Sequence, residues 1–199
     1  MAATVYQFKI VLKDISPTIW RRILVPDTYT FWDLHVAIQD AMGWQDYHLH
    51  VFRIRRKNTH SITEIGIPNE DRFEDEPEII VGWDVPISNY FFDIGTTFEY
   101  EYDFGDSWEH EIIHEGILIK EKGVKYPLCI GGARACPPED CGGVPGYYRM
   151  LEIISNPNDG EYENMMTWLG NDYDPEQFTP SEAKFDNPKK RWNQAFSEY

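Results

Sequence analysis

Two short runs near the start of the chain alternate apolar and polar positions. In residues 5–12 the even-numbered side chains, from Tyr6 to Leu12, are all apolar, and this period of two predicts a strand with one buried face. Residues 18–25 predict a second strand. The link between them is short and rich in turn-forming residues, so the two strands are expected to form an antiparallel hairpin.

The period then changes to that of a helix. Apolar residues recur on one helical face at Phe31, Leu34, Ile38 and Met42. Thr30 followed by Asp33 favours a helix start, and Gly43 suits the left-handed conformation that often ends a helix. The pattern predicts one helix that ends at Gly43.

Alternation returns in the middle of the chain. It predicts strands at 47–54 and 97–103, with a further short strand at 61–67. A tight turn at 104–107 leads into a long partner strand at 108–120, which makes a second hairpin. Residues 57–77 are largely polar and acidic, and 86–92 predict one or two helical turns.

The last third of the chain predicts a loop followed by helices. Residues 121–146 are rich in Gly and Pro and are expected to form a long irregular loop. Helical segments are predicted at 147–154, 161–169 and 181–196. Strands early and helices late indicate a single α+β domain over residues 1–199, with a mostly antiparallel or mixed sheet and helices packed on it.

Charge changes what such a domain is expected to bind. The chain has 34 acidic and 18 basic residues, a formal charge of −16. A surface of this kind repels nucleic-acid phosphates and anionic membranes. No apolar run reaches 18 residues, the first residues do not resemble a signal peptide, and three cysteines are an odd number for a disulfide framework. We expect a cytoplasmic protein that binds a protein partner or a small ligand and not a membrane.

Several stretches together resemble one known family. They are IWRRILVP at 19–26, LHVAIQDAMGW at 34–44, YEYDFGDSWEH at 100–110 and CIGGARACPPEDCGGVPGY at 129–147. In them the chain is similar to the plasmid pRiA4b open-reading-frame-three-like family. The resemblance implies a domain found on plasmids and beside mobile elements, with no assigned activity. The resolvase-like label of some relatives is not carried over, because this acidic chain shows no nucleophile beside a basic cluster.

The predicted turn after residue 102 is the first candidate site. Asp103, Asp106 and His110 bring carboxylates close to an imidazole, a combination that serves acid–base chemistry or cation binding. Glu139 and Asp140 of the Gly/Pro-rich segment complete the candidate cluster if that segment folds back on the turn. The alternative is that Asp and Gly are present because a tight turn requires them.

Three cysteines form the second candidate. Cys129, Cys136 and Cys141 follow the spacing C-x6-C-x4-C, and thiolates are ligands for a transition metal such as zinc. The tight C-x2-C pairs of zinc motifs are absent, however, and a fourth ligand would have to come from elsewhere. The alternative is that these residues pack as small hydrophobic side chains.

Two further groups are secondary candidates. His48 and His50, two apart on a predicted strand, would share one face and could ligate a metal, or could lie beside aromatic residues. Arg22 belongs to the main basic group, together with Arg21, Arg53, Arg55 and Arg56. If the strands at 18–25 and 47–54 were neighbours, these arginines would form a basic strip, although pairing with the many acids of the chain is the simpler explanation.

Two hypotheses remain at this point. One is a non-catalytic binding or interaction module without a cofactor. The other is a metal-binding protein or metal-dependent enzyme that uses Cys129, Cys136 and Cys141 with the turn at 103–110. The absence of a phosphate-loop, nucleophile-elbow or H-E-x-x-H motif favours the first.

Overall fold

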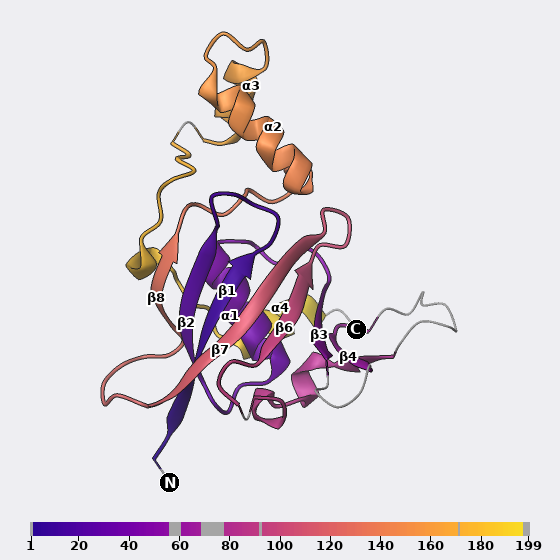
Figure 1. Cartoon of the computed structure of the whole chain (residues 1–199), viewed down its shortest axis with the longest axis vertical. Helices are drawn as coiled ribbons and strands as arrows, with labels where there is room; N and C mark the ends of the chain where they lie inside the picture. Colours follow the sequence, from indigo (N-terminus) through magenta and orange to yellow (C-terminus); the bar gives the residue numbers. More distant parts are fainter. Residues whose placement is uncertain (1, 56–60, 69–77, 92, 171, 197–199) are drawn as a thin grey trace.

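One eight-stranded sheet organises the molecule (Figure 1). The computed structural model describes residues 2–55, 61–68, 78–91, 93–170 and 172–196. Its strands are β1 (Thr4–Leu12), β2 (Trp20–Pro26), β3 (His50–Arg55), β4 (Ile62–Gly66), β5 (Ile79–Val81), β6 (Thr97–Tyr102), β7 (Trp108–Ile119) and β8 (Leu128–Ala133). They lie in the order β5-β4-β3-β6-β7-β1-β2-β8, with the β4–β5 pair parallel and the other pairs antiparallel. The prediction of an α+β fold with a mixed sheet is confirmed.

Both predicted hairpins are present. β1 and β2 pair antiparallel with Phe8 opposite Ile23, and β6 pairs with β7 across the short turn. The apolar face of β1 is buried, as its alternation requires, because it packs against the first helix and the aromatic core.

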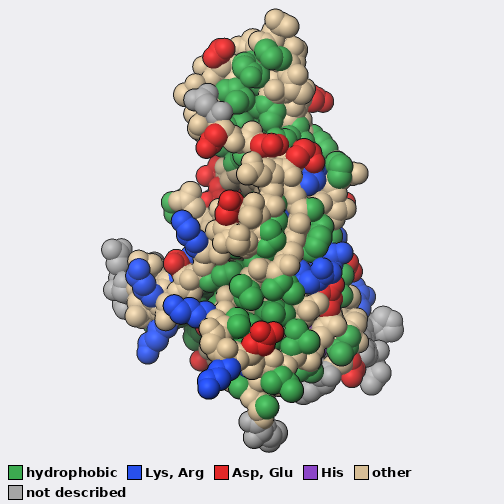
Figure 2. Space-filling view, turned by 90° about the vertical axis from the view of Figure 1, so that its left-hand side faces the viewer, with side chains coloured by type: hydrophobic (Ala, Val, Ile, Leu, Met, Phe, Trp, Pro, Cys, Tyr) green, Lys and Arg blue, Asp and Glu red, His purple; other side chains and the backbone are tan. Residues whose placement is uncertain are grey.

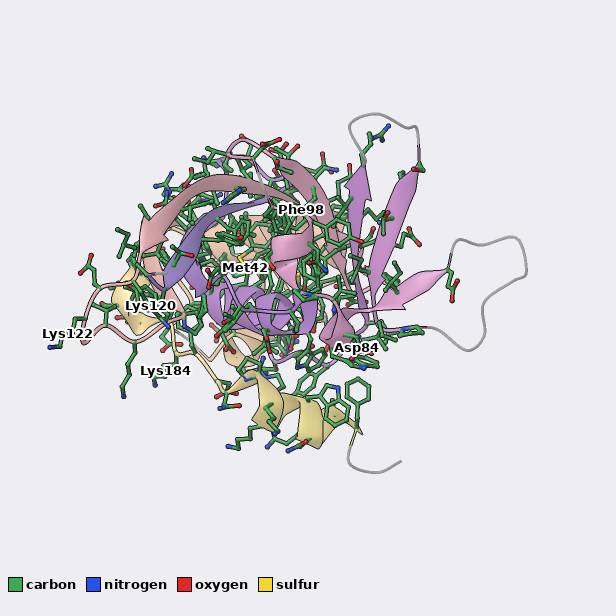
Figure 3. All side chains as sticks on the ribbon, turned by 90° about the horizontal axis from the view of Figure 1, so that it is seen from below. Met42, Asp84, Phe98, Lys120, Lys122 and Lys184 are labelled. Carbon is green, nitrogen blue, oxygen red and sulfur yellow. The ribbon has the colours of Figure 1, made fainter. Side chains whose placement is uncertain are left out.

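The helix α1 (Phe31–Met42) covers the inner face of the sheet. The side chain of Thr30 accepts a hydrogen bond from Asp33 N, and the Asp33 carboxylate accepts one from Thr30 N, which is a complete capping box. Gly43 ends the helix with a φ of 96°. In Figure 3 the sheet curves over α1, and α4 (Pro188–Phe196) lies on the other side of α1.

Two helices extend beyond one end of the sheet. α2 (Gly143–Ser155) and α3 (Tyr162–Trp168) form a lobe that projects at the top of Figure 1. From α3 the chain returns along the β8 side to a short 3-10 helix, η3 (Pro180–Glu182). None of the described helices combines the length and the apolar character that a membrane span needs.

The structure corrects several predicted boundaries. The segment 121–146 is not wholly irregular, since β8 pairs with β2 inside it, and its Gly131 fits beside the ring of Trp20. β3 begins at His50, so His48 precedes the strand. The predicted helix at 181–196 is shorter, because α4 starts at Pro188, a residue suited to a first helical turn. The polar residues 57–60 and the acidic residues 69–77 lie outside the described residues.

The predicted basic strip does not form, because three strands separate β2 from β3. Arg22 instead pairs with Glu115, and Arg53 pairs with both Glu64 and Glu101. Arg56 lies outside the described residues. Arg22 and Arg53 therefore neutralise neighbouring carboxylates on the sheet.

Candidate functional site

The β6–β7 turn is held by one of its own carboxylates. Asp103 Oδ1 accepts hydrogen bonds from the backbone N–H groups of Gly105 (3.0 Å) and Asp106 (3.3 Å). Asp103 has a φ of 58°, a left-handed conformation that Asp tolerates in turns. As expected from the sequence, Asp103 stabilises the turn, but it does so with Oδ1 alone, and Oδ2 makes no hydrogen bond to the turn backbone.

The segment that precedes α2 lies directly against this turn. Asp106 Oδ2 accepts a hydrogen bond from Gly142 N at 3.1 Å. Gly143 approaches so closely that a Cβ there would lie 2.5 Å from Asp106 O. Glu139 accepts a hydrogen bond from Tyr102, the last residue of β6, at 2.5 Å. The Gly/Pro-rich segment and the acidic turn therefore share one surface.

Three ligand-type side chains meet on that surface. His48 Nε2 lies 3.1 Å from Asp140 Oδ1 and 3.6 Å from Asp103 Oδ2. The three atoms all lie within 4.8 Å of one another, and they come from the α1–β3 loop, the β6–β7 turn and the β8–α2 loop. We call His48, Asp103 and Asp140 the junction cluster. A histidine nitrogen and two carboxylate oxygens can share a proton or hold a divalent cation.

The other candidates among the described residues, His50, His110 and Arg22, do not join the junction cluster. His110 is fully buried, with its ring edge-on to Trp44, and burial lowers its pKa to about 4. His50 is also buried and stacks on His35 at 3.5 Å between ring centroids. Arg22 lies on the sheet with Glu115. Asp106 stays beside the cluster, where it holds Gly142 N.

The three cysteines are free thiols in separate environments. Cys129 is buried on β8, while Cys136 and Cys141 are half-buried in the segment leading to α2. Burial raises the pKa of all three thiols, that of Cys141 to about 12. Among the described residues the three sulfurs do not gather within 4.8 Å as a set of ligand atoms. Their surroundings favour the neutral thiol over the thiolate that binds metal.

A groove runs beside the junction cluster. It consists of two cavities, of about 670 Å³ and about 300 Å³, with a shared wall. The shared residues are Met42, Gly43, Trp44, Cys136, Leu169 and Tyr173. The larger cavity extends to Arg21 and Phe178, and the smaller one extends to Glu139 and Trp168. We call the two cavities together the groove. Figure 3 labels one of its lining residues, Met42, the last residue of α1, beneath the curved sheet.

Sequence reasoning placed Glu139 and Cys136 near a site but missed most of the groove. Trp44 lies far along the chain from Tyr173 and Phe178, so local patterns could not group them. Arg21 did carry a signal. In the alternation of residues 18–25 it shares the apolar face with Ile19 and Ile23, and both of these are completely buried.

Comparison with known proteins defines the relatives of this chain. The chain is 42% identical to a protein of unknown function from Methanosarcina mazei Go1, MM3350, whose crystal structure is solved. The two structures match with a TM-score of 0.83 over 93% of this chain and 100% of that one. It is also 35% identical over 176 residues to the uncharacterized protein y4hQ of Sinorhizobium fredii, covering 87% of this chain and 86% of the relative. The family model described as plasmid pRiA4b ORF-3-like protein matches residues 4–182. The chain therefore belongs to the plasmid pRiA4b ORF-3-like protein family.

Proposed function

We propose that this chain is a non-catalytic binding module and that its ligand occupies the groove. The observation that carries this proposal is the concave surface itself. Its larger cavity, about 670 Å³, falls in the usual range for small-molecule sites, about 300–1,000 Å³. Its walls combine Trp44, Leu169, Tyr173 and Phe178 with polar groups, which is typical of ligand pockets.

The chemistry of the groove supports binding over catalysis. Burial raises the pKa of the Cys136 thiol and of the Tyr173 hydroxyl, so both groups stay protonated at neutral pH. Tyr173 donates a hydrogen bond to the Cys136 carbonyl oxygen at 3.2 Å, which fixes its ring on the wall. A nucleophile needs a lowered pKa or an adjacent base. These two groups are set up to pack and donate, not to attack.

The test is to narrow the groove without disturbing the core. Gln177 is exposed at its mouth, so Gln177→Trp should fill the entrance and leave the fold intact. A panel of small amines, carboxylates and neutral aromatics is tested by protein NMR. We expect it to include compounds that shift the Trp44 indole signal. These shifts should be lost in Gln177→Trp and retained in Lys122→Trp, a control at an exposed position outside the groove. Shifts that persist unchanged in Gln177→Trp would contradict the proposal.

The junction cluster supports a second candidate function, divalent cation binding. Two atoms bound to one zinc ion at about 2.0–2.2 Å are separated by about 3.3–3.6 Å at the tetrahedral angle. The contacts of His48 with the two carboxylates, 3.1 and 3.6 Å, are close to this separation. Three protein ligands would leave a coordination position open for a further ligand.

We expect metal-free protein to bind one Zn²⁺ and Asp140→Asn to weaken this binding by about tenfold or more, as the loss of a metal-site partner does. Asn tolerates the left-handed conformation of Asp140, whose φ is 57°. Isothermal titration calorimetry measures the affinity. The matched control is Asp14→Asn, another exposed Asp with a positive φ, 60°. Equal affinity in the two variants would exclude the junction cluster, and loss of binding in Cys136→Ser would place the ion at the cysteines.

A further inference from the structure

The inner end of the groove contains a buried arginine. Arg21 is 1% exposed. Its Nε donates to Ala41 O at 2.9 Å, and its Nη1 donates to Trp20 O at 2.9 Å and to Ala133 O at 3.0 Å. The third nitrogen, Nη2, donates to none of the described residues. An unpaired side-chain nitrogen is either completely buried or accessible, and Nη2 is not among the completely buried ones. It therefore retains access to the cavity that Arg21 lines.

No carboxylate of the described residues neutralises this guanidinium. Within the described ranges no Asp or Glu oxygen lies within 4.0 Å of Arg21, whereas the other buried arginine, Arg134, pairs with Glu176 at 2.5 Å. The Phe178 ring covers one face of the guanidinium at 3.6 Å. A buried charge needs a partner, and a planar guanidinium is matched best by a carboxylate or phosphate. The free edge of Arg21 thus points to an anionic group on the ligand.

The mouth of the groove carries the opposite charge. Asp172, Asp174 and Glu182 line it, against one lysine, Lys184. Asp40 also lines it, but this carboxylate already accepts hydrogen bonds from Arg191 and from Asp186 N. Figure 2 shows several acidic side chains in the upper half of the side of the molecule that is on the left in Figure 1. A simple anion would be repelled there, and a phosphate dianion more strongly.

We propose that the groove binds a free zwitterionic amino acid with an apolar side chain. Its carboxylate pairs with Arg21 Nη2, its ammonium group lies toward the acidic mouth, and its side chain packs on the wall formed by Trp44 and Leu169. This inference rests on the proposed function and names the ligand class. A dipolar ligand satisfies both the cation inside and the acids at the entrance, which a ligand of one charge sign cannot do.

Matched probes separate the two charges of the ligand. Phenylalanine carries both, N-acetylphenylalanine has only the carboxylate, and phenylalaninamide has only the ammonium group. We expect phenylalanine to bind about tenfold or more tightly than either derivative, because a hydrogen bond to a charged group contributes about this factor or more. Inorganic phosphate is expected not to compete. Titration calorimetry, with NMR shifts of the Trp44 indole to locate binding, provides the readout.

Two sets of variants assign the contacts. Asp172→Asn combined with Glu182→Gln changes only exposed side chains, so folding should be unaffected. It should remove most of the preference for phenylalanine over N-acetylphenylalanine, whereas Glu121→Gln, an exposed control outside the groove, should keep it. Arg21→Lys retains the charge but loses the planar fork, and should weaken the preference for phenylalanine over its amide. If Arg21→Lys fails to fold, the Asp172→Asn, Glu182→Gln protein and the three phenylalanine probes still test the inference.

The outcomes are distinct. If phenylalaninamide or phosphate binds as well as phenylalanine, Arg21 does not recognise a carboxylate and the inference is overturned. If N-acetylphenylalanine binds as well, the groove takes a carboxylate of another kind, such as a peptide C-terminus, and the zwitterionic ligand is wrong. In both cases the groove still binds, so the proposed function stands. If none of the probes and none of the compound panel binds in the groove, both proposals fail.

Discussion

We expect Gly146→Ala to lower the free energy of unfolding by about 2–3 kcal/mol, the upper range for overpacking a close contact. A loss of stability is informative here, because replacing glycine by alanine inside a helix normally raises the stability, by about 1 kcal/mol. Gly146 lies in the first turn of α2, where a Cβ would come within 1.9 Å of Cys141 O. The obstacle is backbone, so it cannot rotate away, and the start of α2 or the preceding segment must shift.

Urea denaturation followed by tryptophan fluorescence measures this change. Gly160→Ala is the matched control, because a Cβ at Gly160 has no atom within 4 Å, and it should alter stability only slightly. The shift in Gly146→Ala also moves the segment that carries Glu139 and Asp140, so any Zn²⁺ affinity of the junction cluster should fall with it. A Gly146→Ala protein as stable as the native one would show that α2 does not begin against Cys141 as described.

The hairpins and α1 were predictable because their signals are local. Alternation over residues 5–12 and the Thr30–Asp33 pair act within a few residues, and both are realised in the structure. β8 was missed because its glycines resemble loop residues. Gly132 is required there by a distant partner, since Phe178 occupies the space where a Cβ would stand. Strand β5 is only three residues long, too short for a periodic signal.

In the candidate site, too, local features were predictable from the sequence and long-range contacts were not. The turn residues Asp103 and Asp106 were found because tight turns have a local signature. The partnership of His48 with Asp140 joins positions 92 apart in the chain, and no spacing rule predicts it. His48 was considered with His50, but the strand begins at His50, so the two rings belong to different surroundings. Sequence identifies residue types able to do chemistry, while the topology decides which of them meet.

The stability of this protein is expected to fall as the pH is lowered from about 6.5, the ordinary pKa of histidine, because two histidines are buried in neutral form. Burial lowers the pKa of His110 to about 4. Burial and the neighbouring His35 lower the pKa of His50, whose two ring nitrogens have no hydrogen-bond partner in the part of the chain that the structure describes. Protonation therefore favours the unfolded state below pH 6.5, so the stabilisation is complete above this pH and is lost as the pH falls.

The size of the effect follows from the protons taken up on unfolding. Between pH 6.5 and 5, His110 alone should cost about 2 kcal/mol, at about 1.4 kcal/mol per pH unit, and His50 adds to the loss in the same direction. Urea midpoints measured at pH 7, 6 and 5 give the slope of stability against pH, and this range lies above the titration of most carboxylates.

His110→Phe should make this slope shallower, because a phenyl ring cannot be protonated and the proton uptake on unfolding is lost. This holds even if the substitution also changes the stability at pH 7. Ile112→Val is the control, since it weakens the same core, by about 1 kcal/mol, without changing the number of protons bound and should leave the slope as it is in the native protein. A native protein equally stable at pH 7 and pH 5 would mean that water reaches His50 and His110, and that the aromatic core around them is more open than the structure shows.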